Sequence, residues 1–323
     1  MSRLKFVGGN APEVTDAAAF GRVAVLLGGR SSEREISLKT GAAVHAALVE
    51  RGVDAALIDP AHVSLSQLAD GHFDRAFIAL HGPGGEDGAM QGALEWLGIP
   101  YTGSGVLGSS LCMDKLRTKQ LAAAAGVSTP DWVLLDSAEA VDLALARLGL
   151  PLIVKPASQG SSVGMSRVEA AGDLIGAWRT AAALDPVVIA ERCILGSEYT
   201  VGVLKGMALP AIRIETPRTF YDYQAKYFAN DTLYHLPCGL DVAAEAELRR
   251  LALRAFDAAA ASGWGRVDFM IGDDGVPMLL EINTVPGMTD HSLVPMAAKA
   301  VGIDFPTLAW RVLETSFMRE PSR

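Results

Sequence analysis

Four polar residues near the end of the chain lie within two apolar stretches, and their types suit the binding of a divalent metal. Arg266 and Asp268 are two positions apart in the first stretch. Glu281 and Asn283 are two positions apart at the end of the second. Residues two apart on a strand point to the same face. Because Asp274-Gly275 between the stretches is typical of a two-residue turn, we expect a β-hairpin that carries all four side chains.

The register of this hairpin decides whether the four side chains meet. A two-residue turn places Asp268 opposite Glu281, and a one-residue slip would separate them. The same turn places Arg266 opposite Asn283. Two carboxylates that face each other among apolar neighbours repel, and burying them is costly. A hard cation such as Mg²⁺, carrying nucleotide phosphates, would resolve the conflict; the alternative is a solvated hairpin whose charges face water.

Two lysines stand where phosphate groups could be bound. Lys155 ends the apolar strand Leu152–Lys155, so its ammonium group leaves the edge of a core, and Lys115 lies in a predicted helix. The loop Ser158–Gly164 follows, and its backbone amides and hydroxyls could fold over phosphates. A strand-end lysine more often extends along the surface into water, and a Gly/Ser loop can be an ordinary connection. Neither feature alone therefore identifies a nucleotide site.

The segments after two buried strands carry a further carboxylate and a histidine. Ser32 and Glu35 match the S-x-x-E capping box, which gives Glu35 a structural role. Glu33 could hold an ammonium group at the mouth of the turn, or it could simply complement the helix dipole. His81 stands among glycines at a strand end, where open sheets form ligand crevices, although a core or helix-capping histidine is the alternative. The pair Gly28-Gly29 lacks the full G-x-G-x-x-G fingerprint, so a dinucleotide site is not indicated.

Two carboxylates and one long segment follow in the second half. Glu191 and Glu198 could accept hydrogen bonds from an adenine amino group or from ribose hydroxyls, or they could be exposed. Residues Pro217–Gly239 have no clear period and exceed an ordinary connection. Aromatic side chains and a lysine in this segment suit a lid over a small polar ligand. They are Tyr221, Tyr223, Lys226 and Tyr227.

Composition excludes several classes of protein. The net charge of −9 and the lack of a basic run argue against a nucleic-acid partner. The three cysteines are unclustered, so they indicate neither a disulfide framework nor a zinc site. No apolar run is long enough to span a membrane, and the first residues lack the apolar core of a signal peptide. We therefore expect a cytoplasmic protein.

The order of the predicted strands and helices divides the chain into an extension and three domains. Residues 1–21 are an N-terminal extension, which we expect to be loosely attached. Residues 22–114 alternate strands and helices, which is typical of an open, mostly parallel α/β sheet. Residues 115–206 indicate a small α+β unit. Residues 207–323 contain the lid 217–239, a long helix and the hairpin, and indicate a second α+β unit with a mixed sheet.

With these pieces in order, the chain resembles the D-alanine–D-alanine ligases of the ATP-grasp superfamily. The resemblance covers about Arg22 to Leu313 and rests on the order and spacing of several motifs. These are LLGGRSSEREISL, ALHGPGGEDGAMQG, PYTGSG, MDKLRTK, IVKPASQGSSVGM, FYDYQAKY, GWGRVDFM and LLEINTVPGMTDHSLVP. The resemblance implies a three-domain ATP-grasp fold with central and C-terminal ATP-grasp subdomains.

The resemblance also implies which residues hold ATP and metal. The residues matching the family's nucleotide contacts are Lys115, Lys155, Glu191, Ile194, Glu198 and Lys226. The lysines would contact phosphates, Glu198 the ribose and Glu191 the adenine pocket. The residues matching the ligands of two Mg²⁺ or Mn²⁺ ions are Asp268, Glu281 and Asn283, in agreement with the hairpin argument. The resemblance also allows a monovalent cation.

A further set matches the family's substrate and catalytic residues. Its members are Glu33, His81, Ser161, Tyr221, Tyr227, Arg266, Gly287 and Ser292. Glu33 would hold the ammonium group of the first D-alanine, beside His81. Ser292 would hold the carboxylate of the second. Arg266 and the amide of Gly287 would stabilise the oxyanion.

The implied activity joins two D-alanine molecules through D-alanyl phosphate, for peptidoglycan precursor synthesis, in a homodimer. One alternative is an ATP-grasp ligase for another carboxylate, which the combination of Glu33, Ser161, Tyr227 and Ser292 argues against. A second alternative is a nucleotide-binding module without turnover. It would lack a metal ligand or a phosphate lysine, and the sequence lacks neither.

Overall fold

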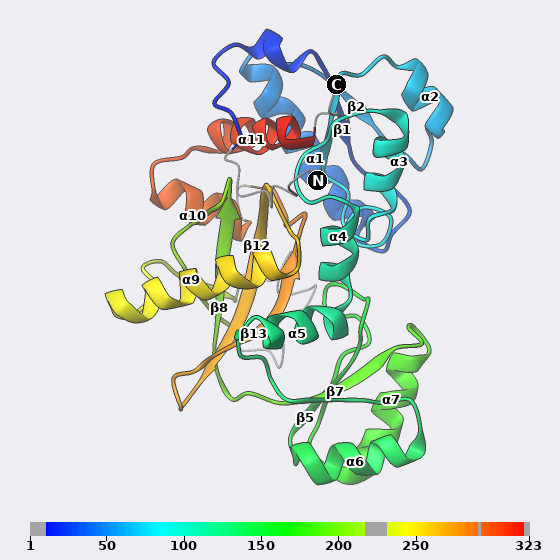
Figure 1. Cartoon of the computed structure of the whole chain (residues 1–323), viewed down its shortest axis with the longest axis vertical. Helices are drawn as coiled ribbons and strands as arrows, with labels where there is room; N and C mark the ends of the chain where they lie inside the picture. Colours follow the sequence, from blue (N-terminus) through cyan, green and yellow to red (C-terminus); the bar gives the residue numbers. More distant parts are fainter. Residues whose placement is uncertain (1–10, 217–230, 290–291, 320–323) are drawn as a thin grey trace, which may run out of the picture.

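Three sheets follow one another along the long axis of the computed structural model (Figure 1). The structure describes residues 11–216, 231–289 and 292–319. In this part of the chain, no helix is both long enough and apolar enough to cross a membrane. The combination of one parallel and two antiparallel sheets confirms the predicted mixture of α/β and α+β structure.

The N-terminal sheet is parallel, as predicted, because a helix carries the chain back after each of its first two strands. Its strand order is β2-β1-β3. Strands β1 and β3 are almost entirely buried, which accounts for their continuous apolar sequence. The elements of this sheet and its helices are β1 (Arg22–Leu26), α1 (Arg34–Glu50), β2 (Asp54–Ile58), α2 (Leu65–Asp70), β3 (Arg75–Ile78) and α3 (Ala89–Leu97).

The central sheet is a small antiparallel unit at the lower end of Figure 1. Its strand order is β4-β7-β5-β6, and helices α6 and α7 pack on it through a cluster of apolar side chains. The elements are β4 (Trp132–Leu134), α6 (Ala138–Leu148), β5 (Leu152–Pro156), β6 (Ser166–Val168), α7 (Leu174–Ala182) and β7 (Val188–Arg192).

The third sheet lies between the other two and is covered by α9 (Figure 1). Its order is β11-β10-β8-β12-β13, with β9 on β8. All of these described pairs are antiparallel, so the mixed sheet expected for this part of the chain is wrong. Short connections, such as those within β8–β9 and β12–β13, can join only antiparallel neighbours. The strands are β8 (Gly196–Leu204), β9 (Met207–Ala208), β10 (Ile212–Glu215), β11 (Leu233–His235), β12 (Trp264–Gly272) and β13 (Pro277–Asn283), and the helix is α9 (Val242–Ala258). Since β8 belongs to this sheet, sheet membership favours a domain boundary before Gly196; the boundary at 206 stays a prediction.

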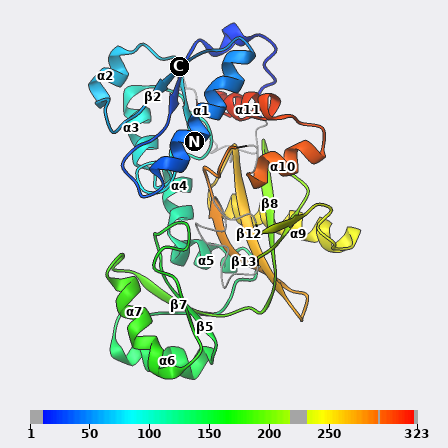
Figure 2. The same ribbon diagram turned by 180° about the vertical axis from the view of Figure 1, so that it is seen from behind.

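The end of the chain returns to the N-terminal sheet, as the views from both sides show (Figures 1 and 2). Helices α10 (Leu293–Ala300) and α11 (Phe305–Glu314) share one apolar core with β1 and β3. The expectation of a loosely attached extension is wrong for residues 11–21. The amide of Val14 donates to Glu314 at 2.8 Å, and Phe20 is buried against Trp310.

One helix was not predicted from the sequence. Only the helix that contains Lys115 was expected here, but the chain forms α4 (Val106–Met113) and then α5 (Lys115–Ala124). Asp114 separates them and caps α5 by accepting from the amide of Arg117 at 3.0 Å. Packing stabilises α4: a side chain at Gly108 would collide with the carbonyl of Ala260. Tertiary contact therefore overrides the weak helix propensity of its Gly and Ser residues.

Candidate active site

The hairpin brings the four predicted polar residues together. Strands β12 and β13 place Asp268 opposite Glu281. They also place Arg266 opposite Asn283. The predicted pairing is therefore confirmed for all four residues.

The predicted two-residue turn at Asp274-Gly275 is wrong. The amide of Gly275 donates to the carbonyl of Gly272 at 3.0 Å, and Gly275 has a φ of 71°, so the loop has three residues. A three-residue loop shifts the pairing by one position, so that Phe269 faces Leu279. A bulge at Leu280 shifts the pairing back before the polar residues are reached.

The carboxylate of Asp268 is buried and held by three side chains. Arg266 donates through Nε to Oδ1 at 2.9 Å and through Nη2 to Oδ2 at 2.8 Å. Thr200 on β8 donates to Oδ1 at 2.6 Å, and Asn283 donates through Nδ2 to Oδ2 at 3.0 Å. Thr200 could not be predicted from the sequence, because only the pairing of β8 with β12 brings it opposite Asp268.

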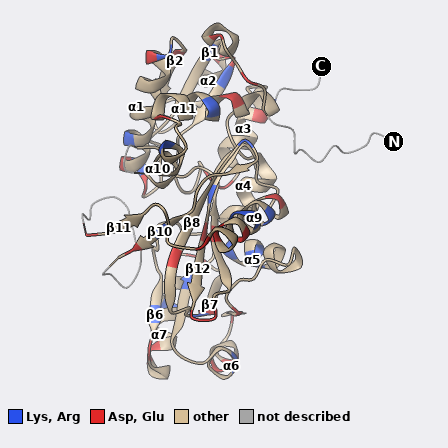
Figure 3. Cartoon of the chain, turned by 90° about the vertical axis from the view of Figure 1, so that its left-hand side faces the viewer, with Lys and Arg blue, Asp and Glu red and all other residues tan. Residues whose placement is uncertain are grey.

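Glu281 connects the hairpin to the predicted phosphate-binding residues. Its carboxylate lies 3.3 Å from the ammonium group of Lys115, on α5. Lys115 also donates to the carbonyl of Gln159, in the Gly/Ser-rich loop, at 2.7 Å. The helix, the loop and the hairpin thus meet at one point. Charged residues of both signs are spread along the elements in Figure 3, so the site is defined by these contacts rather than by overall charge.

A cavity of about 360 Å³ lies between the central sheet and the third sheet. This volume is within the usual range for small-molecule and cofactor sites. The predicted nucleotide residues among those described all line it, together with two predicted metal ligands, Asp268 and Glu281. The nucleotide residues are Lys115, Lys155, Glu191, Ile194 and Glu198.

Glu191 sits between two lysines at the wall of this cavity. Lys155 donates to its Oε1, and the ammonium group of Lys119 lies 2.6 Å from its Oε2. Burial opposes ionisation of Glu191, but Lys119 and Lys155 bring its pKa below the ordinary value. Sequence reasoning missed Lys119. Its one signal was its position one helical turn after Lys115, on the same helix face.

A second cavity of about 50 Å³ adjoins the first and is lined by polar groups. Both cavities are lined by Lys115 and Glu281. Five predicted substrate residues from three parts of the chain line the smaller cavity. They are Glu33, His81, Ser161, Arg266 and Gly287.

The turn before α1 differs from the prediction. The helix begins at Arg34 with Glu33 as its N-cap, so the Ser32–Glu35 capping box is wrong. Ser31 ties the turn instead: its hydroxyl accepts from the amide of Glu33 at 3.2 Å and donates to the carbonyl of His81 at 2.7 Å. The carboxylate of Glu33 makes no capping bond and accepts from Ser161.

His81 is buried and fixed in one tautomer. Its Nδ1 lies 2.9 Å from the carbonyl of Val285, which can only accept, and its Nε2 lies 2.9 Å from the hydroxyl of Thr40. Burial lowers the pKa of His81, although Glu33 opposes this. A neutral ring therefore donates through Nδ1 and accepts through Nε2.

Glu86 is a further group that sequence reasoning missed. It lines the smaller cavity and accepts from the amide of Gly82 at 2.8 Å. Burial and the nearby Glu33 raise its pKa to about 8. A carboxyl group with this pKa is largely protonated at neutral pH.

The remaining predicted residues are not brought to the cavities or lie outside the described part. Ser292 precedes α10, and its hydroxyl accepts from the amide of Thr289 at 3.0 Å. It is absent from the described residues that line either cavity. The predicted lid residues Tyr221, Tyr223, Lys226 and Tyr227 lie outside the described residues. The predicted lid loop is wrong for Leu233–His235, which form β11 and pair with β10.

Known proteins are similar to this chain over nearly its whole length. A family model described as the D-ala D-ala ligase C-terminus matches residues 121–314, and the N-terminus model of the same family matches residues 61–104. The chain belongs to the D-alanine–D-alanine ligase family. The D-alanine–D-alanine ligase of Alkalilimnicola ehrlichii is 59% identical over 307 residues, covering 95% of this chain and 98% of that protein.

A second relative and a solved structure are also similar to this chain. The D-alanine–D-alanine ligase of Methylococcus capsulatus is 56% identical over 304 residues, covering 94% of this chain and 98% of that protein. A crystal structure of the Bacillus anthracis D-alanine–D-alanine ligase complexed with ATP superposes with a TM-score of 0.81. That protein is 35% identical, and the match covers 93% of this chain and 98% of the other. The predicted ATP-grasp ligase fold is confirmed.

Proposed function

We propose that this chain joins two D-alanine molecules into D-alanyl-D-alanine, with ATP as the energy source and D-alanyl phosphate as the intermediate. The observation that carries this proposal is the pair of adjoining cavities that share Lys115 and Glu281. The larger one has the size for a nucleotide, and the smaller one suits a small zwitterion. Family membership supports the same reaction.

The first step is phosphoryl transfer at the shared boundary. A carboxylate oxygen of the first D-alanine attacks the γ-phosphorus of ATP, and the bond to the bridging oxygen breaks to release ADP. This chain supplies positioning and positive charge, which is what phosphoryl transfer requires. Lys155 faces the larger cavity, and Lys115 stands at the boundary between the two cavities. Glu33, whose carboxylate accepts a hydrogen bond from Ser161, holds the ammonium group of the first D-alanine.

The second step forms the peptide bond. The amine of the second D-alanine attacks the acyl carbon, the bond from that carbon to the phosphate oxygen breaks, and the amine loses its proton. Negative charge develops on the carbonyl oxygen in the transition state. Arg266 and the amide of Gly287 stabilise this charge, and both line the smaller cavity. The resemblance assigns the carboxylate of the second D-alanine to Ser292, which is not among the described residues that line the two cavities.

Two Mg²⁺ or Mn²⁺ ions complete the site in this proposal. Among the described residues, no three His, Cys, Asp or Glu side chains gather as a metal-binding group. The proposed ligands are instead the carboxylates of Asp268 and Glu281 and the amide oxygen of Asn283. Such oxygen ligands fit Mg²⁺, since it keeps several water and phosphate ligands of its own. When bound, the ions neutralise phosphate charge.

Several finer assignments rest on the resemblance. The lid residues Tyr221, Lys226 and Tyr227 close the site over the substrates, and Lys226 reaches the γ-phosphate. A monovalent cation is also compatible with the family. The product enters peptidoglycan precursor synthesis in the cytoplasm.

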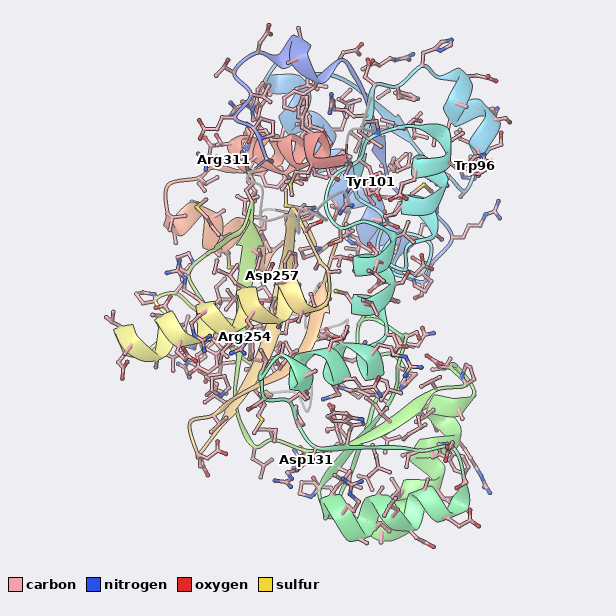
Figure 4. The ribbon with its side chains drawn as sticks, in the orientation of Figure 1. Trp96, Tyr101, Asp131, Arg254, Asp257 and Arg311 are labelled. Atoms are coloured by element: carbon pink, nitrogen blue, oxygen red, sulfur yellow. The ribbon has the colours of Figure 1, made fainter. Side chains whose placement is uncertain are left out.

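The active form is a homodimer in this proposal. Trp96 on α3 points away from the molecule and is 92% exposed (Figure 4). Leu107 on the adjacent helix α4 is also exposed. Large exposed apolar groups on neighbouring helices are typical of surfaces that meet a partner.

The test of the proposed function is phosphate release from ATP with D-alanine, L-alanine or no amino acid. Release should depend on D-alanine and on Mg²⁺. Equal release with L-alanine, or release that needs no amino acid, would argue for another carboxylate substrate or for simple ATP hydrolysis.

A further inference from the structure

Lys119 occupies an unusual position for a lysine. It lies in the interior of α5, and its side chain is completely buried, whereas Arg117 on the same helix is exposed. Fully buried lysines are rare unless an opposite charge or several acceptors surround the ammonium group. The contacts of Lys119 should therefore reveal why this charge is kept inside.

The ammonium group of Lys119 is enclosed by acceptors from two neighbouring elements. It lies 2.6 Å from Oε2 of Glu191 on β7 and donates to the hydroxyl of Thr129 at 2.7 Å. It also lies 3.5 Å from the carbonyl of Pro130. Thr129 and Pro130 belong to the connection from α5 to the central sheet, where Figure 4 labels Asp131. Burial lowers the pKa of Lys119 to about 8, and Glu191 opposes this.

Glu191 divides its two oxygens between two lysines with different surroundings. Lys155 donates a hydrogen bond to Oε1 and lines the nucleotide-sized cavity. The ammonium group of Lys119 contacts Oε2, and Lys119 is not among the described residues that line this cavity. One lysine thus faces the cavity, and the other stands behind the carboxylate.

The charges of Lys119, Glu191 and Lys155 explain why two lysines share one buried carboxylate. Two ammonium groups and one carboxylate leave one net positive charge, and the outer lysine faces the site of an anionic ligand. Without Lys119, Lys155 and Glu191 would form a neutral pair. The full charge of Glu191 would then compete with nucleotide phosphates for the ammonium group of Lys155. In a poorly solvated site such competition is strong.

We propose that Lys119 is a positioning residue for nucleotide binding, which holds Glu191 in place and offsets its charge so that Lys155 remains available to phosphates. The inference rests on the proposed nucleotide role of the larger cavity. Lys119 acts through Glu191 and makes no contact with the nucleotide.

A second contact adds a link to the metal-binding hairpin. Thr129 accepts from Lys119 and donates to the carbonyl of Leu279 on β13 at 2.8 Å. Lys119 therefore also fixes the connection between the two sheets that enclose the cavity.

The test compares ADP affinity in the full-length wild-type chain and in K119M, by titration calorimetry well below the thermal midpoint. Methionine keeps the length of the side chain and removes its charge. We expect about tenfold or greater weakening in K119M, as for the loss of one partner of a buried charge pair. K119R should recover part of the affinity. R117M, which removes an exposed charge from the same helix, should bind ADP like the wild type.

A double-variant comparison separates positioning from general stability. In the E191Q background the competing carboxylate is absent, so K119M/E191Q should bind ADP within about threefold of E191Q, well short of the weakening expected for K119M alone. The comparison of K119M/E191Q with E191Q still tests the positioning role of Lys119 if K119M alone fails to fold. The proposal is overturned if K119M binds ADP like the wild type, or if K119M weakens binding equally in both backgrounds. Failure of the wild type itself to bind ADP would instead contradict the proposed function.

Discussion

Ser161 donates a hydrogen bond to the carboxylate of Glu33, although the two residues are 128 positions apart. One lies in the Gly/Ser-rich loop after β5, and the other is the N-cap of α1. Ser161 and its neighbour Ser162 both adopt left-handed backbone conformations, with φ of 52° and 60°. Non-glycine residues in this region carry strain, which functional sites often retain. The loop is therefore held in an unfavourable conformation that presents Ser161 to Glu33.

The first prediction concerns this contact. Replacing Ser161 by alanine removes a hydrogen bond to a charged group, which is worth about 1.5–3 kcal/mol. We expect kcat/KM for D-alanine to fall by about one to two orders of magnitude, while the affinity for ADP stays near the wild-type value. Steady-state kinetics and ADP titration measure the two quantities.

The neighbouring Ser158 provides the control. Its backbone amide, rather than its hydroxyl, donates to Asp185 at 2.7 Å. S158A should therefore keep its kcat/KM for D-alanine. An S161A enzyme that is as active as S158A would show that the contact with Glu33 does not serve the first subsite.

The second prediction concerns the proposed metal ligand Glu281. E281Q removes one carboxylate from Mg²⁺ and also the charge that faces Lys115 at 3.3 Å. Turnover should become undetectable, while the midpoint of thermal unfolding changes little. D273N, at the exposed hairpin turn, should remain active. Near-normal turnover of E281Q would contradict the metal assignment.

The third prediction concerns Arg266. Removing one group that stabilises transition-state charge costs about 10²–10³ in turnover. R266A should therefore lower kcat more than it raises the KM for ATP. A variant in which only KM changes would assign Arg266 to ground-state binding. R266K keeps the charge but not the two-point contact with Asp268, so its kcat should lie between that of the wild type and that of R266A.

The fourth prediction follows from the raised pKa of Glu86. Burial and Glu33 raise it from 4.5 to about 8, and Arg266 opposes them. Between these values the folded chain binds a proton that the unfolded chain has lost. The resulting stabilisation is full below the unfolded pKa and disappears as the pH rises towards 8. The thermal midpoint of the wild type should fall more steeply over this range than that of E86Q, which cannot titrate. Parallel curves would contradict the assignment.

The sequence predicted local features well where a repeating pattern or a run of apolar residues carried the information. The buried strands of the parallel sheet and the pairing of Asp268 with Glu281 are examples. That pairing was right although the predicted turn was wrong, because the bulge at Leu280 compensates for a longer loop. The alternation of apolar residues in the sequence does not reveal a bulge of this kind.

Contacts between distant parts of the chain could not be predicted in this way. Lys119 has an ordinary helical sequence around it, and only the packing of α5 against β7 makes it a partner of Glu191. The same holds for Thr200 behind Asp268. The Ser32–Glu35 capping box is wrong for a related reason: the helix begins at Arg34, and the hydroxyl of Ser31, bonded to the distant carbonyl of His81, fixes the turn.

The central claim is that D-alanine is activated as an acyl phosphate before the peptide bond forms. The most direct measurement incubates the enzyme with ATP, Mg²⁺ and D-alanine labelled with ¹⁸O in its carboxylate. The phosphate and the dipeptide that form are then analysed by mass spectrometry. Attack on the γ-phosphorus and later cleavage of the acyl bond transfer one carboxylate oxygen to phosphate. The account predicts one labelled oxygen in phosphate for each D-alanyl-D-alanine formed. Dipeptide formation with unlabelled phosphate would contradict it.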